Sequence, residues 1–185
     1  SSLYQITPLG AVLPKDQNDV LNLMEYSQKN SIPLLARGGG SSQCGQTVNE
    51  EIVLDYSMHQ NKILELNLEE KYVWVQPGIV LDSLNKYLKP HGLGFPVDVS
   101  TSSRATIGGM TGNNSCGSRS LYYGNMVNNV LAVEAILDDG SIHTFEDIDK
   151  NYLQATNDQN RQYEIIKNFL QIKEETKNDI DQYWP

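Results

Sequence analysis

The sequence predicts an α+β fold, in which small mixed or antiparallel sheets are flanked by helices. Several short strand-like segments follow one another along the chain, while only two or three segments have the periodicity of an amphipathic helix. A doubly wound α/β sheet would need a helix between most of its strands. Two glycine-rich segments also interrupt the regular elements, and long irregular segments of compact domains are usually functional or disordered.

The elements of the first half are predicted from their end signals and their periodicity. Asp16 follows Pro14 and is placed to cap a helix at its N-terminus. Leu81, Leu84 and Leu88 mark one face of a second helix, closed by Pro90 and Gly92. Short apolar or β-branched runs predict four strands, at 31–36, 52–54, 62–66 and 72–76.

The second half begins with a long segment, residues 92–124, that has little periodicity and many small residues. Residues 127–137 have strand character, and Asp139-Gly140 predicts a two-residue hairpin turn into a partner strand at 141–145. After Glu146 the composition becomes more polar, and a helix is predicted to run toward the C-terminus. Its apolar positions are Ile165, Ile166, Phe169, Leu170 and Ile172.

Composition and charge narrow the class of protein. A chain of 185 residues with 39% hydrophobic and 20% charged residues has the composition of an ordinary globular domain. Its formal net charge of -9 repels nucleic acid and anionic lipid, so neither is expected as a partner. An acidic protein can still bind a diphosphate, because main-chain N–H groups in a glycine-rich turn supply a local positive field.

The two cysteines, Cys44 and Cys116, match neither a disulfide framework nor a zinc site. A reducing, cytoplasmic compartment is therefore expected, with peripheral membrane association left open for a longer protein. No apolar run reaches the ~20 residues that span a bilayer, and no signal peptide is recognised. Because the chain starts at Ser1 and stops at Pro185 after a polar stretch, we expect a fragment of a longer protein.

The first glycine-rich segment, Arg37 to Gly45, follows directly after a predicted buried strand and contains three consecutive glycines. Glycines allow positive φ and close approach of the main chain to a ligand, and successive N–H groups then form a concave anion site. The segment is neither a phosphate-binding loop of the Walker type nor a Rossmann fingerprint. Taken alone, it is equally compatible with a flexible loop that binds nothing.

The second segment, residues 96–117 followed by Tyr122 to Gly124, carries two glycine clusters with amide and hydroxyl side chains between them. Such groups could match the hydrogen-bonding edges of a large polar heterocycle such as a flavin ring. The alternative is a long surface loop made of turn-forming residues, which is less attractive in a domain that has two such segments.

Together these segments resemble a known family. Arg37 to Gly45, Val75 to Gly78, Thr106 to Gly117 and Tyr123 to Gly140 are similar to four ordered motifs of the PCMH-type FAD-binding domain, found in flavoproteins of the vanillyl-alcohol oxidase type. The likeness covers roughly residues 6–145. It is strongest to the D-lactate, glycolate and D-2-hydroxyglutarate dehydrogenase branch, including bacterial members fused to iron–sulfur modules.

The resemblance implies a set of FAD-binding residues. The first segment would hold the diphosphate, through Arg37, Gly38, Gly39, Gly40, Ser41, Ser42 and Gly45. Pro77 and Gly78 would lie against the adenosine side, Gly124 would allow close approach, and Val133 would mark the adenine end. The diphosphate and flavin ring would also be lined by the second segment, through Thr106, Gly108, Gly109, Asn113, Asn114, Ser115 and Gly117.

Departures from the family pattern are also informative. Relatives with covalently bound flavin carry a histidine where this chain has Ser41, and their attaching cysteine does not align with Cys116. Non-covalent FAD is therefore expected, with both cysteines as small packed residues. The three histidines are expected to be structural or exposed: His59, His91 and His143. No catalytic or metal-binding residue is expected in this chain, since the resemblance places them in a second domain.

The resulting hypothesis is an FAD-binding domain over residues 1–146, with two lobes divided near 78–92, followed by a helical segment over 147–185. The full enzyme would transfer a hydride from a 2-hydroxyacid to flavin N5 and pass electrons to a quinone, a cytochrome or an iron–sulfur module. Two alternatives stay open. One is another flavoenzyme of the superfamily, such as a sugar or alcohol oxidase or an enolpyruvyl-sugar reductase; the other is a non-catalytic nucleotide- or anion-binding module.

Overall fold

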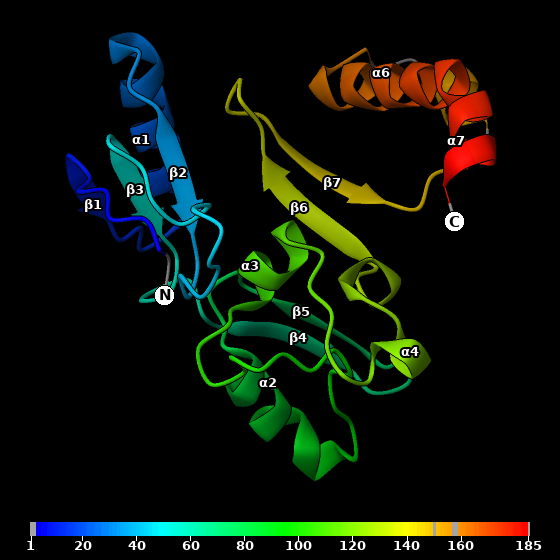
Figure 1. Cartoon of the computed structure of the whole chain (residues 1–185), viewed down its shortest axis with the longest axis horizontal. Helices are drawn as coiled ribbons and strands as arrows, with labels where there is room; N and C mark the ends of the chain where they lie inside the picture. Colours follow the sequence, from blue (N-terminus) through cyan, green and yellow to red (C-terminus); the bar gives the residue numbers. More distant parts are fainter. Residues whose placement is uncertain (1–2, 150, 157–158, 185) are drawn as a thin grey trace. The chain divides into compact units, whose positions relative to one another are not determined.

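The computed structural model describes residues 3–149, 151–156 and 159–184 of the 185-residue chain (Figure 1). Its internal contacts divide the chain into two compact units, Ser1–Val130 and Leu131–Pro185. The first unit holds both glycine-rich segments, so it carries most of the candidate site. The predicted domain boundary at 146 and the predicted lobe division near 78–92 remain predictions.

The first unit opens with a three-stranded parallel sheet (Figure 1). Its central strand is β3 (Ile52–Asp55), and β1 (Gly10–Val12) and β2 (Leu34–Arg37) both pair with it in parallel. Helix α1 (Gln17–Asn30) connects β1 to β2. The predicted N-cap is confirmed, because the Asp16 carboxylate accepts a hydrogen bond from the N–H of Asp19 at 3.1 Å.

An antiparallel hairpin and a helix form the next layer. Strands β4 (Ile63–Asn67) and β5 (Tyr72–Val75) pair with each other, and α2 (Leu81–Leu88) follows them. The apolar face predicted for α2 is confirmed: Leu84 and Leu88 form a buried cluster with Ile79. Partly buried side chains of the hairpin pack against this cluster, namely Ile63, Leu66, Val73 and Val75. The 3₁₀ helix η1 (Lys89–His91) contains Pro90, and Gly92 then ends the segment with φ +70°.

The second glycine-rich segment has a core of its own and is more regular than predicted. Short helices α3 (Ile107–Gly112) and α4 (Ser120–Tyr123) and the 3₁₀ helix η2 (Met126–Asn128) lie within it. The core consists of Leu81, Val97, Ala105, Met110 and Met126. The strand predicted to start at 127 was placed too early, because the side chains of Asn125 and Asn128 cap η2 reciprocally.

The second unit begins with the antiparallel hairpin of β6 (Ala132–Ile136) and β7 (Ile142–Glu146). The predicted two-residue turn is wrong. The N–H of Gly140 donates to the carbonyl of Leu137 at 2.9 Å, so the loop holds three residues, 138–140. Only Gly140 has positive φ there, whereas a two-residue turn of type I′ needs positive φ at both central residues.

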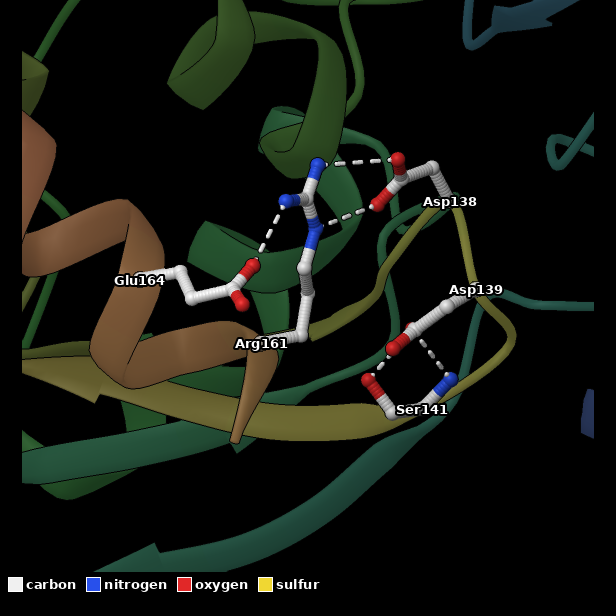
Figure 2. A network of polar contacts seen from close by, with 5 residues as sticks. All are labelled: Asp138, Asp139, Ser141, Arg161 and Glu164. Carbon is white, nitrogen blue, oxygen red and sulfur yellow. Dashed lines mark hydrogen bonds and ion pairs between the residues drawn. The ribbon is translucent and has the colours of Figure 1, made fainter. Parts of the chain in front are cut away.

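In the part of this unit that the structure describes, three helices follow the hairpin: α5 (Tyr152–Ala155), α6 (Arg161–Glu175) and α7 (Lys177–Tyr183). Figure 2 shows how the start of α6 is tied to the hairpin turn. The Arg161 guanidinium donates two hydrogen bonds to the Asp138 carboxylate, at 3.0 and 2.9 Å, and one to Glu164 at 3.0 Å. These contacts, with Asp138 first, raise the pKa of Arg161, and the guanidinium in turn lowers the pKa of Asp138.

The predicted α+β class with small sheets is confirmed, although the described three-stranded sheet is parallel throughout and the two hairpins are antiparallel, so that none of them is mixed. Among the described residues, no helix is both long and apolar enough to cross a membrane. The same residues contain no group of three or more histidine, cysteine or acidic side chains placed to hold a metal ion.

Candidate cofactor-binding site

The two glycine-rich segments are packed directly against each other. A Cβ atom added at Gly38 would lie 2.0 Å from the Thr106 hydroxyl oxygen, and one added at Gly39 would lie 2.0 Å from the carbonyl oxygen of Arg104. Real Cβ atoms essentially never come this close to another heavy atom, so the contact requires glycine at both positions. The structure thus brings together residues of the two segments that are more than sixty positions apart in the sequence.

The Pro77-Gly78 motif joins the same cluster. The N–H of Gly108, in the first turn of α3, donates to the carbonyl of Pro77 at 2.8 Å. Gly78 donates to the carbonyl of Gln60 at 2.7 Å, and a Cβ atom there would lie 2.0 Å from the Tyr56 carbonyl oxygen. Three of the predicted motifs therefore meet around the start of α3, where Thr106 is 1% exposed.

Main-chain donors with no partner are concentrated in the first segment. Within the described residues, no hydrogen bond is donated by the N–H groups of Gly38, Gly39, Ser41 and Ser42. In α3, by contrast, the N–H groups of Gly108 and Gly109 are engaged by Pro77 and by the Thr106 hydroxyl. Because main-chain N–H groups need partners, the first segment has the donor capacity that a phosphate ligand would use.

Arg37 adds a positive charge to these donors. Its guanidinium lies beside Gly40, which has φ +61°, and a Cβ atom at that position would lie 2.5 Å from an Nη atom. The Arg37 Nε atom is buried and has no hydrogen-bond partner, and no ion pair of the described residues involves Arg37. A buried donor of a charged group is costly without an acceptor, which an anionic ligand would supply.

Gln46 links the two segments through side chains, and the sequence patterns did not single it out. Its amide oxygen accepts a hydrogen bond from the Ser42 hydroxyl at 2.7 Å, and its amide nitrogen donates to Asn113 at 3.5 Å. The position of Gln46 directly after Gly45 is the one signal that could have drawn attention to it. Gln46 thereby bridges Ser42 and Asn113, which are both predicted to bind FAD.

Other predicted site residues have contacts that shape the second segment itself. The Asn114 side chain accepts a hydrogen bond from the N–H of Val127 at 3.0 Å, and the Ser115 carbonyl accepts one from Met126 at 3.1 Å. Gly124 has φ +77° and packs against Asn128. These contacts stabilise the conformation of the segment. Asn114, Ser115 and Gly124 therefore have partners within the protein itself.

Gly117 is also held by close packing, against the main chain of Asp98. A Cβ atom at Gly117 would lie 1.3 Å from the Asp98 carbonyl oxygen. The Asp98 carboxylate accepts hydrogen bonds from the Ser118 hydroxyl at 2.6 Å and the N–H of Arg119 at 3.0 Å. The Ser118 contact, followed by that of Arg119, lowers the pKa of Asp98 below its usual range.

The remaining predicted residue, Val133, lies on β6 in the second unit. The expectation that both cysteines are packed is wrong, since Cys44 and Cys116 are exposed. They lie in turn-rich segments whose close contacts are made by glycines, which leaves their side chains outside. His91 is exposed, and His59 and His143 are partly buried.

A sequence model of the FAD-binding domain family matches residues 8–146, three quarters of the chain. The chain belongs to this family. The match contains both glycine-rich segments and the Pro77-Gly78 motif, so the cluster around α3 lies inside the FAD-binding domain. FAD as the cofactor is supported by this match.

Curated relatives of this FAD-binding domain include several dehydrogenases. The chain is 45% identical over 148 residues to the D-2-hydroxyglutarate dehydrogenase of Haemophilus influenzae, covering 77% of this chain and 14% of that protein. It is 39% identical over 189 residues to the D-2-hydroxyglutarate dehydrogenase of Pseudomonas putida, covering 100% of this chain and 19% of that protein. The chain thus spans less than a fifth of the length of these relatives.

Solved structures share the fold of this domain. An alkyldihydroxyacetonephosphate synthase superposes with a TM-score of 0.65 at 26% identity, over 74% of this chain and 26% of that one. The 6-hydroxy-D-nicotine oxidase of Arthrobacter nicotinovorans superposes with a TM-score of 0.69 over 82% of this chain and 32% of that one. At 20% identity, the second similarity concerns the fold alone.

Proposed function

We propose that this chain is the cofactor-binding part of an FAD-linked dehydrogenase that oxidises a 2-hydroxyacid, with a D-2-hydroxyglutarate-type dicarboxylate as the first candidate substrate. Four relatives named D-2-hydroxyglutarate dehydrogenase are 39–45% identical to the chain. Relatives named glycolate oxidase or D-lactate dehydrogenase are 31–36% identical. The higher identity to the D-2-hydroxyglutarate dehydrogenases favours a dicarboxylate substrate over the smaller hydroxyacids.

The observation that carries the proposal is the set of unpaired donors in the first segment. Four main-chain N–H groups and the buried Arg37 Nε atom have no partner among the described residues. Together they supply a positive field for the FAD diphosphate within a protein of net charge -9. The proposed FAD-binding residues are Arg37, Gly38, Gly39, Gly40, Ser41, Ser42, Gly45, Pro77, Gly78, Thr106, Gly108, Gly109, Asn113, Asn114, Ser115, Gly117, Gly124 and Val133.

When bound, FAD would supply the hydride acceptor at N5 for the α-hydrogen of the substrate. The part of this chain is to hold and orient the cofactor, since no catalytic or metal-binding residue is proposed within it. Ser41 is a hydroxyl where covalent relatives have histidine, so the proposed attachment is non-covalent. The substrate clamp and the base would lie elsewhere. So would the electron acceptor, which would be a quinone, a cytochrome or an iron–sulfur module. A cytoplasmic location remains a prediction.

A second candidate, another flavoenzyme on the same domain, is supported only by the shared fold with an oxidase and a synthase. The anion-binding module is disfavoured, because the family match includes the second segment as well as the first.

The substrate is tested by anaerobic mixing of the intact, FAD-loaded protein with D-2-hydroxyglutarate, L-2-hydroxyglutarate, D-lactate and glycolate. The proposal predicts that the oxidised flavin absorption band bleaches fastest with D-2-hydroxyglutarate and much more slowly with its L-enantiomer. Bleaching by a nicotinamide cofactor alone, or by a sugar and by no hydroxyacid, would contradict it.

A further inference from the structure

The N-terminal arm, residues 3–8, contacts the first glycine-rich segment although almost all of it precedes the matched FAD-binding domain. A Cβ atom built on Gly45 would lie 3.2 Å from Cδ2 and 3.3 Å from Cε2 of the Tyr4 ring. Its three nearest heavy atoms all belong to that ring. The family match begins only at residue 8, so the domain pattern does not account for this contact.

Gly45 is the point where the first segment needs support. Its φ of +89° is a conformation that residues with a side chain rarely adopt, and its carbonyl accepts a hydrogen bond from the N–H of Val48 at 3.3 Å. A glycine in such a turn has many alternative conformations, so holding it in one of them costs conformational entropy. The Tyr4 ring covers one side of Gly45 and removes part of that freedom by steric exclusion.

The turn fixed at Gly45 leads directly into the contacts of the site. The next residue, Gln46, accepts the hydrogen bond of Ser42 at 2.7 Å and donates to Asn113 at 3.5 Å. Ser42 and Asn113 belong to the two segments proposed to bind FAD. A chain of contacts therefore runs from the Tyr4 ring through Gly45 and Gln46 into both segments.

The residues directly after the arm are attached to the sheet. The N–H of Leu9 donates to the carbonyl of Glu50 at 2.8 Å, and β1 then pairs with the central strand β3. The arm is thus anchored at its C-terminal end through β1, and the first segment at its N-terminal end through β2. The Tyr4 side chain remains 58% exposed, so it contributes little to the buried core.

We propose that Tyr4 is a positioning residue of the cofactor site, which holds the first glycine-rich segment in the conformation that binds the FAD diphosphate. This inference rests on the proposed FAD site. It makes the arm outside the family domain a functional part of the site. Because the ring acts by covering Gly45, we expect a phenylalanine ring at this position to keep the effect.

The test compares Tyr4→Ala, Tyr4→Phe and wild type in the intact protein, with Tyr26→Ala as the matched control. Tyr26 is a tyrosine of the same unit, on α1, and is similarly exposed at 54%. Tyr4→Ala is expected to weaken FAD binding on the order of tenfold. This is the size of effect expected when ligand binding has to order one additional group. Tyr4→Phe and Tyr26→Ala are expected to bind as wild type, and all four proteins to share one unfolding midpoint.

Tryptic cleavage after Arg37, followed by peptide mapping without FAD, gives a readout that does not depend on the cofactor. Cleavage is expected to be faster in Tyr4→Ala than in the other three proteins. Unchanged FAD affinity in Tyr4→Ala, or an equal loss in Tyr4→Phe, would overturn the inference. If wild type bound no flavin, the proposed function would fail, and equal cleavage rates would then overturn the loop-holding role of Tyr4 separately.

Discussion

Glycines in the two segments have different neighbours, and the consequences for stability can be separated by single substitutions. Gly38 faces the Thr106 hydroxyl of the second segment, whereas Gly112 at the end of α3 has nothing within 4 Å of an added Cβ atom. Gly38→Ala is expected to destabilise the protein by about 1–3 kcal/mol through overpacking. Gly112→Ala is expected to leave the free energy of unfolding unchanged or slightly raised, as measured by chemical denaturation.

The same contact can be tested by a double-mutant cycle. Thr106→Ala removes the hydroxyl that the new methyl group would strike, but also removes the side chain that caps α3, at a cost of about 1 kcal/mol. The combined Gly38→Ala, Thr106→Ala variant should therefore lose less stability than the sum of the two single variants. Strict additivity would show that the two segments are not in contact at this point.

Asp98 makes the stability of the second segment depend on pH. Hydrogen bonds from Ser118 and from the N–H of Arg119 lower the pKa of Asp98 in the folded state. A lowered pKa means that this contribution is present above the ordinary carboxyl pKa of about 3.9, and is lost as the pH falls through the folded value.

Chemical denaturation from neutral pH down to about pH 3 should therefore show a smaller loss of stability below about pH 4 for Asp98→Asn than for wild type. Ser118→Ala, which removes the largest cause of the shift, should give an intermediate slope. Identical slopes in all three proteins would refute this role of Asp98.

At the scale of residues, sequence patterns identified the segments but not the contacts within them. Three consecutive glycines predict a turn that can approach a ligand, yet Gly38 and Gly39 are required by Thr106 and Arg104, which lie far along the chain. Gln46 was missed for the same reason, because its role depends on its distance from Asn113. Such contacts are tertiary, and no local propensity encodes them.

At the scale of elements, the link between α6 and the β6–β7 turn is predicted to order the start of the helix (Figure 2). Arg161→Gln removes three charge-assisted hydrogen bonds to Asp138 and Glu164. Hydrogen exchange in the first turns of α6 is expected to become faster in this variant. Lys177→Gln, which removes an exposed pair with Asp181 at 3.4 Å, is the control and should leave exchange in α6 unchanged.

Helix starts and strand cores could be predicted because their signals are local. Asp16 caps α1 as expected, and the spacing of Leu81, Leu84 and Leu88 gives the buried face of α2. The hairpin turn and the start of β6 were predicted incorrectly, because side chains of Asp139 and Asn128 bond to nearby main-chain groups and alter the turns. Short helices in the second segment depend on its own small core, which local periodicity does not reveal.

At the scale of the whole molecule, the acidic chain and its anionic cofactor carry charge of the same sign. The net charge of -9 disfavours a diphosphate at long range, so local donors must supply the attraction. Those donors are the unpaired N–H groups of the first segment and Arg37. Binding of FAD to the folded protein alone should then stabilise it, by about 2.7 kcal/mol at about 100 times the Kd.

The most direct measurement is equilibrium binding of FAD to the intact protein, followed by absorption and thermal unfolding, for wild type and Arg37→Gln. We expect a flavin band that survives desalting in wild type, leaves the chain on denaturation, and is accompanied by a raised Tm. Arg37→Gln should retain the fold but bind FAD more weakly, with a smaller loss of affinity for riboflavin, which has no phosphate. A folded wild-type protein that shows neither a flavin band nor stabilisation by FAD would contradict FAD binding at this site.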